Sequence, residues 1–252
     1  MTRSRAIELL LISLLAIAAA AALPLSQGQF FWSWDALNHH VYLGLVAEQP
    51  RWELDVIPAS FQSYQYPYLY WPIYRLSLWP ISGAALGAIW AALQAGMLLP
   101  PLWLISVRLL PDEGPAWQGV LWRALGCALG AMSLIVIAGL ESTANDLLAA
   151  VPLLWAIAVG LQDKPTQRQA FVAAALWGVA TAFKWSNGLA LPWLLLWWWV
   201  SQRPQWPWRR GLALSLGAVT GFAVAYAPWG LQLWRVTGNP FYPMFTSVFG
   251  GH

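Results

Sequence analysis

Asp35 is the residue whose type and position point most directly to chemistry. It stands in the string Trp34-Asp35-Ala36-Leu37-Asn38-His39-His40, just beyond the first long apolar run of the chain. A carboxylate at this position could take a proton from a substrate hydroxyl and act as a general base. The alternative is structural, because Ser33 or Asp35 could instead cap a helix that begins here. The sequence leaves both roles open.

His39 and His40 are the titratable side chains closest to Asp35 in the sequence. Because they are consecutive, a helix would turn their rings to different sides, which disfavours a metal ion held by both. We therefore keep them as candidate pocket residues and not as a metal-binding pair.

Polar residues recur between later apolar runs. Glu141, Asn145 and Asp146 lie between the third and fourth runs, and Lys184 and Asn187 lie between the fifth and sixth. Together they could hold a phosphate-bearing substrate, a divalent cation such as Mg²⁺ or Mn²⁺, or one another. Asp146 has a structural alternative, since a carboxylate in the first turn of a helix complements the helix dipole.

Three cations are candidates for binding a phosphate. Lys184 lies near the end of an apolar run, where it could contact a phosphate, pair with Asp146, or extend its amine to the membrane surface. Arg75 has the same choice between a phosphate and the membrane surface. Arg235 follows the last apolar run, together with the pocket candidate Asn239.

The elements that must position these residues are apolar helices. The 252-residue chain is 59% hydrophobic and 9% charged, against about 25% charged in an ordinary globular domain. Runs of about twenty apolar residues can cross a bilayer as helices. We expect an all-α protein, a polytopic bundle of transmembrane helices forming a single membrane domain over residues 1–252. The predicted spans are 6–24, 84–107, 118–139, 144–161, 170–184, 187–200 and 211–228.

The basic residues predict the orientation of this bundle. With a cytoplasmic N-terminus, the cytoplasmic side carries Arg3, Arg5, Arg108, Lys164, Arg168, Arg203, Arg209 and Arg210. The other side carries only Arg51, Arg75, Lys184 and Arg235, as the positive-inside rule requires. We expect a multi-pass protein of a bacterial inner membrane that contacts lipids and binds no nucleic acid, because no basic stripe could follow a phosphate backbone.

Residues 25–83 form one long extracytoplasmic loop in this topology. Leu37, Val41 and Leu45 recur at helical spacing within residues 33–47, and a second short segment over 69–79 has similar character. We expect both to be amphipathic helices at the membrane surface. A loop of this length in a compact protein is usually functional.

Five strings, in order along the chain, resemble those of the GT-C superfamily of integral-membrane glycosyltransferases. They are Trp34-Asp35 with His39-His40-Val41-Tyr42, Tyr66-Pro67-Tyr68-Leu69, Asn145-Asp146-Leu147, Gly178-Val179-Ala180-Thr181-Ala182-Phe183-Lys184 and Gly238-Asn239-Pro240-Phe241-Tyr242-Pro243. A cytoplasmic N-terminus, one span and a long outer loop that starts with an Asp also agree with that family. The resemblance covers a seven-span module, whereas family members usually continue into further spans.

The resemblance implies a lipid-linked donor, typically a polyprenyl-phosphate sugar, bound in a cavity that faces away from the cytoplasm. Asp35 would be the base, Lys184 or an arginine would bind the donor phosphate and stabilise it as a leaving group, and Tyr66 would line the pocket. Some branches need a divalent metal, which Asp35 could bind together with Asp146 or Glu141.

Two alternatives belong to other functional classes. The chain could be a non-catalytic membrane subunit that packs its Trp-rich faces against a second membrane protein. It could also be a small transporter, but the predicted spans carry almost no internal charge and show no paired broken helices.

Overall fold

The computed structural model describes residues 2–30, 33–55, 58–110, 115–140, 142–162, 166–192, 195 and 208–250. Within these ranges the chain is helical and has no strand. Three helices are long and apolar enough to cross a membrane: α1 (Arg3–Gln27), α4 (Gly83–Leu109) and α10 (Trp208–Thr237). The all-α prediction is confirmed. By length and composition, these three helices are candidate membrane spans. The complete seven-span bundle stays a prediction.

Shorter helices occupy the other predicted spans. They are α5 (Ala116–Ala131), α6 (Leu134–Leu140), α7 (Asp146–Gly160) and α8 (Gln167–Phe183). A turn divides the predicted span 118–139 into α5 and α6, where the Ser133 hydroxyl accepts a hydrogen bond from Val136 N at 3.3 Å and so starts a new helix. The 3-10 helix η3 (Trp185–Ala190) overlaps the start of the predicted span 187–200, most of whose remainder lies outside the described residues.

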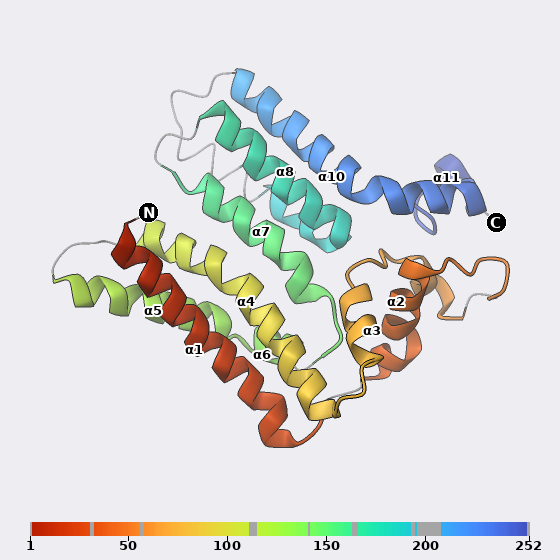
Figure 1. Ribbon diagram of the computed structural model, residues 1–252. Helices are drawn as coiled ribbons and strands as arrows, with labels where there is room; N and C mark the ends of the chain where they lie inside the picture. The colour runs from red at the N-terminus through yellow and green to blue at the C-terminus, as the bar shows by residue number, and fades with distance from the viewer. Residues whose placement is uncertain are drawn as a thin grey trace.

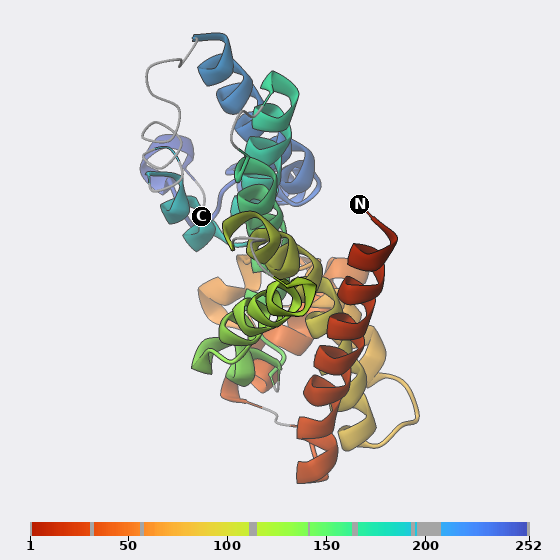
Figure 2. The same ribbon diagram turned by 90° about the vertical axis from the view of Figure 1, so that its left-hand side faces the viewer.

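Neighbouring helices pack in the order α1, α4, α7, α8 and α10 (Figures 1 and 2). The tightest contact joins α8 to α10, which run in the same direction (Figure 1). A Cβ atom on Gly221 would overlap the carbonyl oxygen of Ala175, and one on Gly217 would overlap that of Phe171. Small residues therefore allow the two backbones to approach closely, as in many membrane helix pairs.

A buried ion pair joins three helices of the first half of the chain. The Arg123 guanidinium on α5 donates two hydrogen bonds to the Glu8 carboxylate on α1, at 2.6 and 2.8 Å. Trp103 on α4 donates to the same carboxylate at 2.9 Å. Because each buried charge has a partner, α1 and α5 can carry these residues inside an otherwise apolar contact.

The loop between α1 and α4 folds as a compact helical unit. It contains the π-helix η1 (Ala36–His40), α2 (Val41–Glu48), the 3-10 helix η2 (Ser60–Tyr64) and α3 (Trp71–Ser77). Helices thus occupy both predicted segments, 33–47 and 69–79, while their position at a membrane surface stays a prediction. A hydrophobic cluster fixes the unit to α4 and α7 through Phe30, Ile73, Leu76, Leu86, Trp90 and Leu148.

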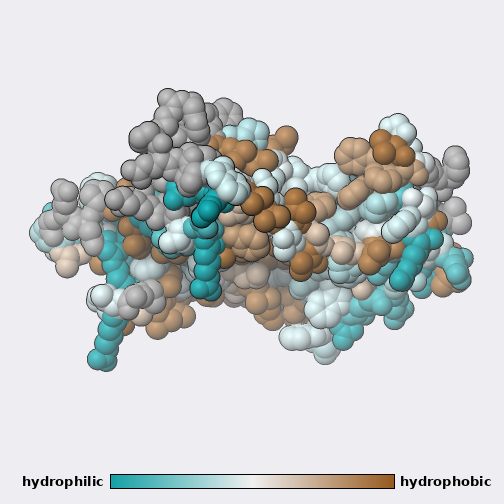
Figure 3. Space-filling model, turned by 90° about the horizontal axis from the view of Figure 1, so that it is seen from above, coloured by the Kyte–Doolittle hydropathy of each residue, from teal (hydrophilic) through white to brown (hydrophobic). Residues whose placement is uncertain are grey.

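Large apolar side chains are exposed along the long helices. Leu15 on α1 is 72% exposed and Val224 on α10 is 71% exposed. Figure 3, which shows the molecule from above, shows hydrophobic residues interspersed among hydrophilic and intermediate ones on this face. Such a surface is unfavourable in water and is compatible with contact to lipid.

Basic residues gather at the end where α1, α8 and α10 begin and α4 ends (Figure 1). Arg3, Arg108, Arg168 and Arg209 belong to these helix ends, while Lys164 and Arg203 lie outside the described residues. The loop unit and the other ends of the same helices lie at the opposite side of the molecule. This arrangement is compatible with the predicted orientation, which stays a prediction.

Candidate functional site

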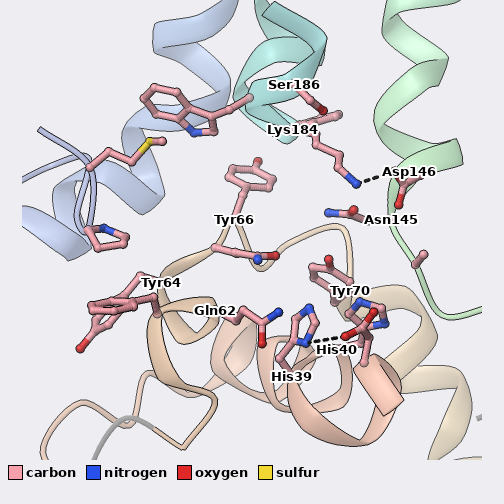
Figure 4. Close-up of a pocket in the computed structure, with 18 of the residues that line it drawn as sticks. His39, His40, Gln62, Tyr64, Tyr66, Tyr70, Asn145, Asp146, Lys184 and Ser186 are labelled. Atoms are coloured by element: carbon pink, nitrogen blue, oxygen red, sulfur yellow. Dashed lines mark hydrogen bonds and ion pairs between the residues drawn. The ribbon is translucent and has the colours of Figure 1, made fainter. Parts of the chain in front are cut away.

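A cavity of about 510 Å³ lies between the loop unit and the ends of α7, α8 and α10 (Figure 4). Its walls come from four separate parts of the chain, within residues 35–70, 144–146, 183–186 and 226–244. The predicted site residues that line it are Asp35, His39, His40, Tyr66, Asn145, Asp146 and Lys184. The structure therefore brings most of the predicted polar residues together around one hollow.

Lys184 and Asp146 form an ion pair across the cavity wall (Figure 4). Asp146 is the first residue of α7, and Lys184 directly follows the last residue of α8. The Asp146 side chain is 50% exposed and the Lys184 side chain is 36% exposed, so both remain accessible to a molecule in the cavity. Pairing with Asp146 was one of the three alternatives predicted for Lys184, and it does not exclude a phosphate ligand.

Asn187 holds this pair in place without lining the cavity. Its side-chain amide donates to the carbonyl oxygen of Ala149 on α7 at 3.0 Å and to that of Ala180 on α8 at 2.9 Å. The amide therefore ties the two helices together beside Lys184. Asn187 was predicted as a pocket residue and instead bridges the helices.

Asp35 does not cap a helix. The Ser33 hydroxyl accepts the hydrogen bond from the Ala36 amide at 3.1 Å, and Asp35, which has helical backbone angles, makes no capping hydrogen bond in the described part of this segment. The carboxylate is 57% exposed and lines the cavity. Ser33, and not Asp35, therefore caps this helix. The role of general base stays a prediction for Asp35.

The two histidines lie on the same wall of the cavity. Their ring centroids are 4.3 Å apart in an edge arrangement, so the expectation that they face different sides is wrong. Both histidines belong to the π-helix η1, which has a wider turn than an ordinary α-helix. The sequence indicated an ordinary helix and gave no sign of this turn.

His40 is anchored on two sides. Its Nδ1 lies 2.6 Å from the Thr143 hydroxyl, and its ring stacks on Tyr70 with centroids 4.7 Å apart. Burial, and to a smaller extent the neighbouring His39, lower the pKa of His40 to about 4, although Asp35 and Asp146 oppose this shift. A neutral imidazole at neutral pH therefore joins the loop unit to the turn before α7.

Aromatic side chains form the remaining wall of the cavity. Tyr66 donates a hydrogen bond to the carbonyl oxygen of Ala225 at 3.2 Å, and burial raises the pKa of Tyr66 to about 12. Trp185, Tyr226 and Phe241 pack edge-to-face or stacked beside it. Of these aromatic residues, only Tyr66 was predicted to line the pocket. The tyrosines that alternate at positions 64, 66, 68 and 70 also indicate an aromatic wall.

Three other predicted site residues do not line the cavity. Arg75 is 53% exposed and pairs with Glu48 at 3.3 Å, and Arg235 is exposed in the last turn of α10. Asn239 is fully buried, and its amide donates to the carbonyl oxygens of Met244 and Gly250 at 2.7 and 3.1 Å. It therefore shapes the turn that carries the cavity residues Phe241, Tyr242, Pro243 and Met244.

The predicted divalent metal site includes Glu141, which lies outside the described residues. Among the residues that are described, no group of three or more His, Cys, Asp or Glu side chains could hold a metal ion. A Mg²⁺ or Mn²⁺ ion bound by Asp35 together with Asp146 or Glu141 therefore stays a prediction.

No family model, curated protein or solved structure matches this chain. The likeness to GT-C glycosyltransferases therefore remains a resemblance of short strings.

Proposed function

We propose that the chain is a membrane glycosyltransferase of the GT-C type. It would transfer a sugar from a polyprenyl-phosphate donor to a hydroxyl acceptor on the extracytoplasmic side of the membrane. The observation that carries the proposal is the cavity itself, because a carboxylate, a lysine and an aromatic wall from distant segments surround one space of about 510 Å³. That volume falls within the range of small-molecule sites.

The reaction assigns one task to each charged group. Lys184 exchanges its contact with Asp146 for a contact with the donor phosphate, which is the leaving group. The acceptor oxygen forms a bond to the anomeric carbon as the bond from that carbon to the phosphate oxygen breaks. Asp35 takes the proton that the acceptor hydroxyl loses, and the cation stabilises the negative charge that grows on the phosphate.

The apolar surface supports a lipid-linked donor. The cavity lies at the ends of α8 and α10, and α10 is one of the three helices long and apolar enough to cross a membrane. A phosphate held at Lys184 could therefore keep its polyprenyl chain in the adjoining lipid. This geometry favours a lipid-linked sugar over a soluble sugar nucleotide.

The test is a transfer assay with the protein in lipid nanodiscs, radiolabelled polyprenyl-phosphate hexoses and pentoses, and a membrane-lipid extract as the source of acceptors. Asp35→Asn should lower the rate by about 10²- to 10⁴-fold, the usual contribution of a general base. Asp55→Asn is the matched control, because Asp55 pairs with Arg51 at 2.7 Å and does not line the cavity.

Full activity of Asp35→Asn would contradict the assignment of the base. Absence of transfer with every donor, together with stoichiometric co-purification of another membrane protein, would instead favour the non-catalytic subunit.

A further inference from the structure

His39 has an unusual environment for a histidine beside a candidate base. Its residue is 4% exposed, and its Nδ1 atom is buried with no hydrogen-bond partner among the described residues. The Asp35 carboxylate is the charged group that lies against it, with Oδ1 3.9 Å from Nδ1. In Figure 4 the dashed line at His39 marks this approach.

The segment that carries His39 is fixed on both sides. The Asn38 amide donates to the Gln62 side-chain oxygen at 2.8 Å, and His40 is held by Thr143 and Tyr70. His39 lies between these anchors, one turn after Asp35 in the π-helix η1. Such π-turns are rare and occur often at functional sites, and here Nδ1 of His39 lies 3.9 Å from the carboxylate of Asp35.

Among the residues that the structure describes, no hydrogen bond restrains the Asp35 side chain in a comparable way. The described segment around it supplies no capping hydrogen bond, and the side chain is 57% exposed. A general base must be held within hydrogen-bonding reach of the proton that it removes, and hydrogen bonds in an empty site are often long and shorten when substrate binds. A fixed donor beside Asp35 would supply that restraint.

We propose that His39 is a positioning residue for Asp35, donating a hydrogen bond from Nδ1–H to Oδ1 and leaving Oδ2 to take the acceptor proton. This inference rests on the proposed function. The surroundings of His39 favour a neutral imidazole. Burial lowers the pKa of His39, and the opposing effect of Asp35 is smaller. The adjacent His40 is also neutral at neutral pH. A neutral imidazole can donate from Nδ1 only in the tautomer that a carboxylate partner favours.

The two amide isosteres of histidine separate this role from simple packing. The amide nitrogen of Asn occupies the place of Nδ1, whereas that of Gln reaches the place of Nε2. His39→Asn should keep kcat within a few-fold of the wild-type value, and His39→Gln should lower kcat by about 100-fold, the cost of a misplaced catalytic group. The KM for the donor should stay unchanged in both variants. Equal losses in the two variants, or retention by Gln alone, would overturn the proposal.

A second measurement does not need activity. The chain has three histidines, so ¹⁵N-histidine NMR of the protein in nanodiscs can assign the tautomer of His39. The proposal expects the Nδ1–H form and a shift of its resonances in Asp35→Asn but not in Asp55→Asn. An Nε2–H tautomer, or resonances insensitive to Asp35, would overturn it. A protein without any transfer activity would refute the proposed function, while this spectrum would still decide the contact between His39 and Asp35.

Discussion

At the scale of single residues, the cavity combines groups that are buried and fixed with groups that are accessible. His40 and Thr143 are almost completely buried and join two segments, whereas Lys184 and Asp146 are partly exposed. An exposed ion pair contributes only about 0–1 kcal/mol to stability. Lys184 can therefore give up Asp146 for a substrate phosphate at little cost to the fold, which suits a binding group better than a structural one.

His40 predicts a stability that depends on pH. Its pKa is about 4 in the folded protein and about 6.5 in an unfolded chain. Between these values the unfolded chain binds a proton that the folded chain does not, so the free energy of unfolding falls as the pH falls from about 6.5 to about 4. The loss levels off below that window. Thermal unfolding in detergent from pH 4 to pH 8 measures this loss of stability.

His40→Gln is the comparison, because an amide can keep a hydrogen bond to Thr143 but does not titrate. The variant should show a weaker loss of melting temperature with acid than the wild-type protein. Parallel curves for the two proteins would show that other groups cause the acid loss.

At the scale of elements, the contact between α8 and α10 decides where Lys184 and Tyr226 lie. Gly178 on α8 and Gly217 and Gly221 on α10 each face a backbone atom of the other helix. No side chain could occupy these positions unless the helices moved apart. Because Lys184 follows α8 directly and Tyr226 belongs to α10, separation of the helices would widen the cavity.

Gly221→Ala should therefore destabilise the protein by about 1–3 kcal/mol, the usual cost of overpacking. Gly96→Ala in α4 is the control, since its Cβ would meet Ile17 at an ordinary 3.5 Å, and it should be neutral or stabilise the helix by up to about 1 kcal/mol. Denaturant or thermal unfolding in the same detergent compares the two variants. Equal stability of both would show that α8 and α10 can separate without cost.

At the scale of the whole molecule, the sequence predicts which residues come together at one end of the helices better than it predicts where each side chain points. Apolar runs of known length place the residues between them at one side of a membrane or the other, and Asp35, Asp146 and Lys184 were grouped for that reason. The same argument grouped Arg75 and Arg235, which point elsewhere. The rotation of a helix about its axis depends on its packing partners, and a single sequence does not contain that information.

The same limit explains the other differences between expectation and structure. The ion pair of Glu8 with Arg123 joins residues 115 positions apart, so neither residue identifies the other in the sequence. Asn187 and Asn239 have the polarity of pocket residues, but both bond to backbone carbonyl oxygens and fix helices and turns. Residue type alone could not separate these structural amides from binding ones.

Donor binding tests the central claim most directly, because the account requires one cavity to hold a lipid-linked phosphate at Lys184. The measurement is the affinity of the protein in nanodiscs for polyprenyl-phosphate sugars. Lys184→Gln should weaken binding by about 10- to 100-fold, as expected for one lost charge-assisted hydrogen bond. Arg75→Gln, outside the cavity and paired with Glu48, should bind like the wild-type protein. Wild-type affinity in Lys184→Gln, or equal weakening in both variants, would contradict the account.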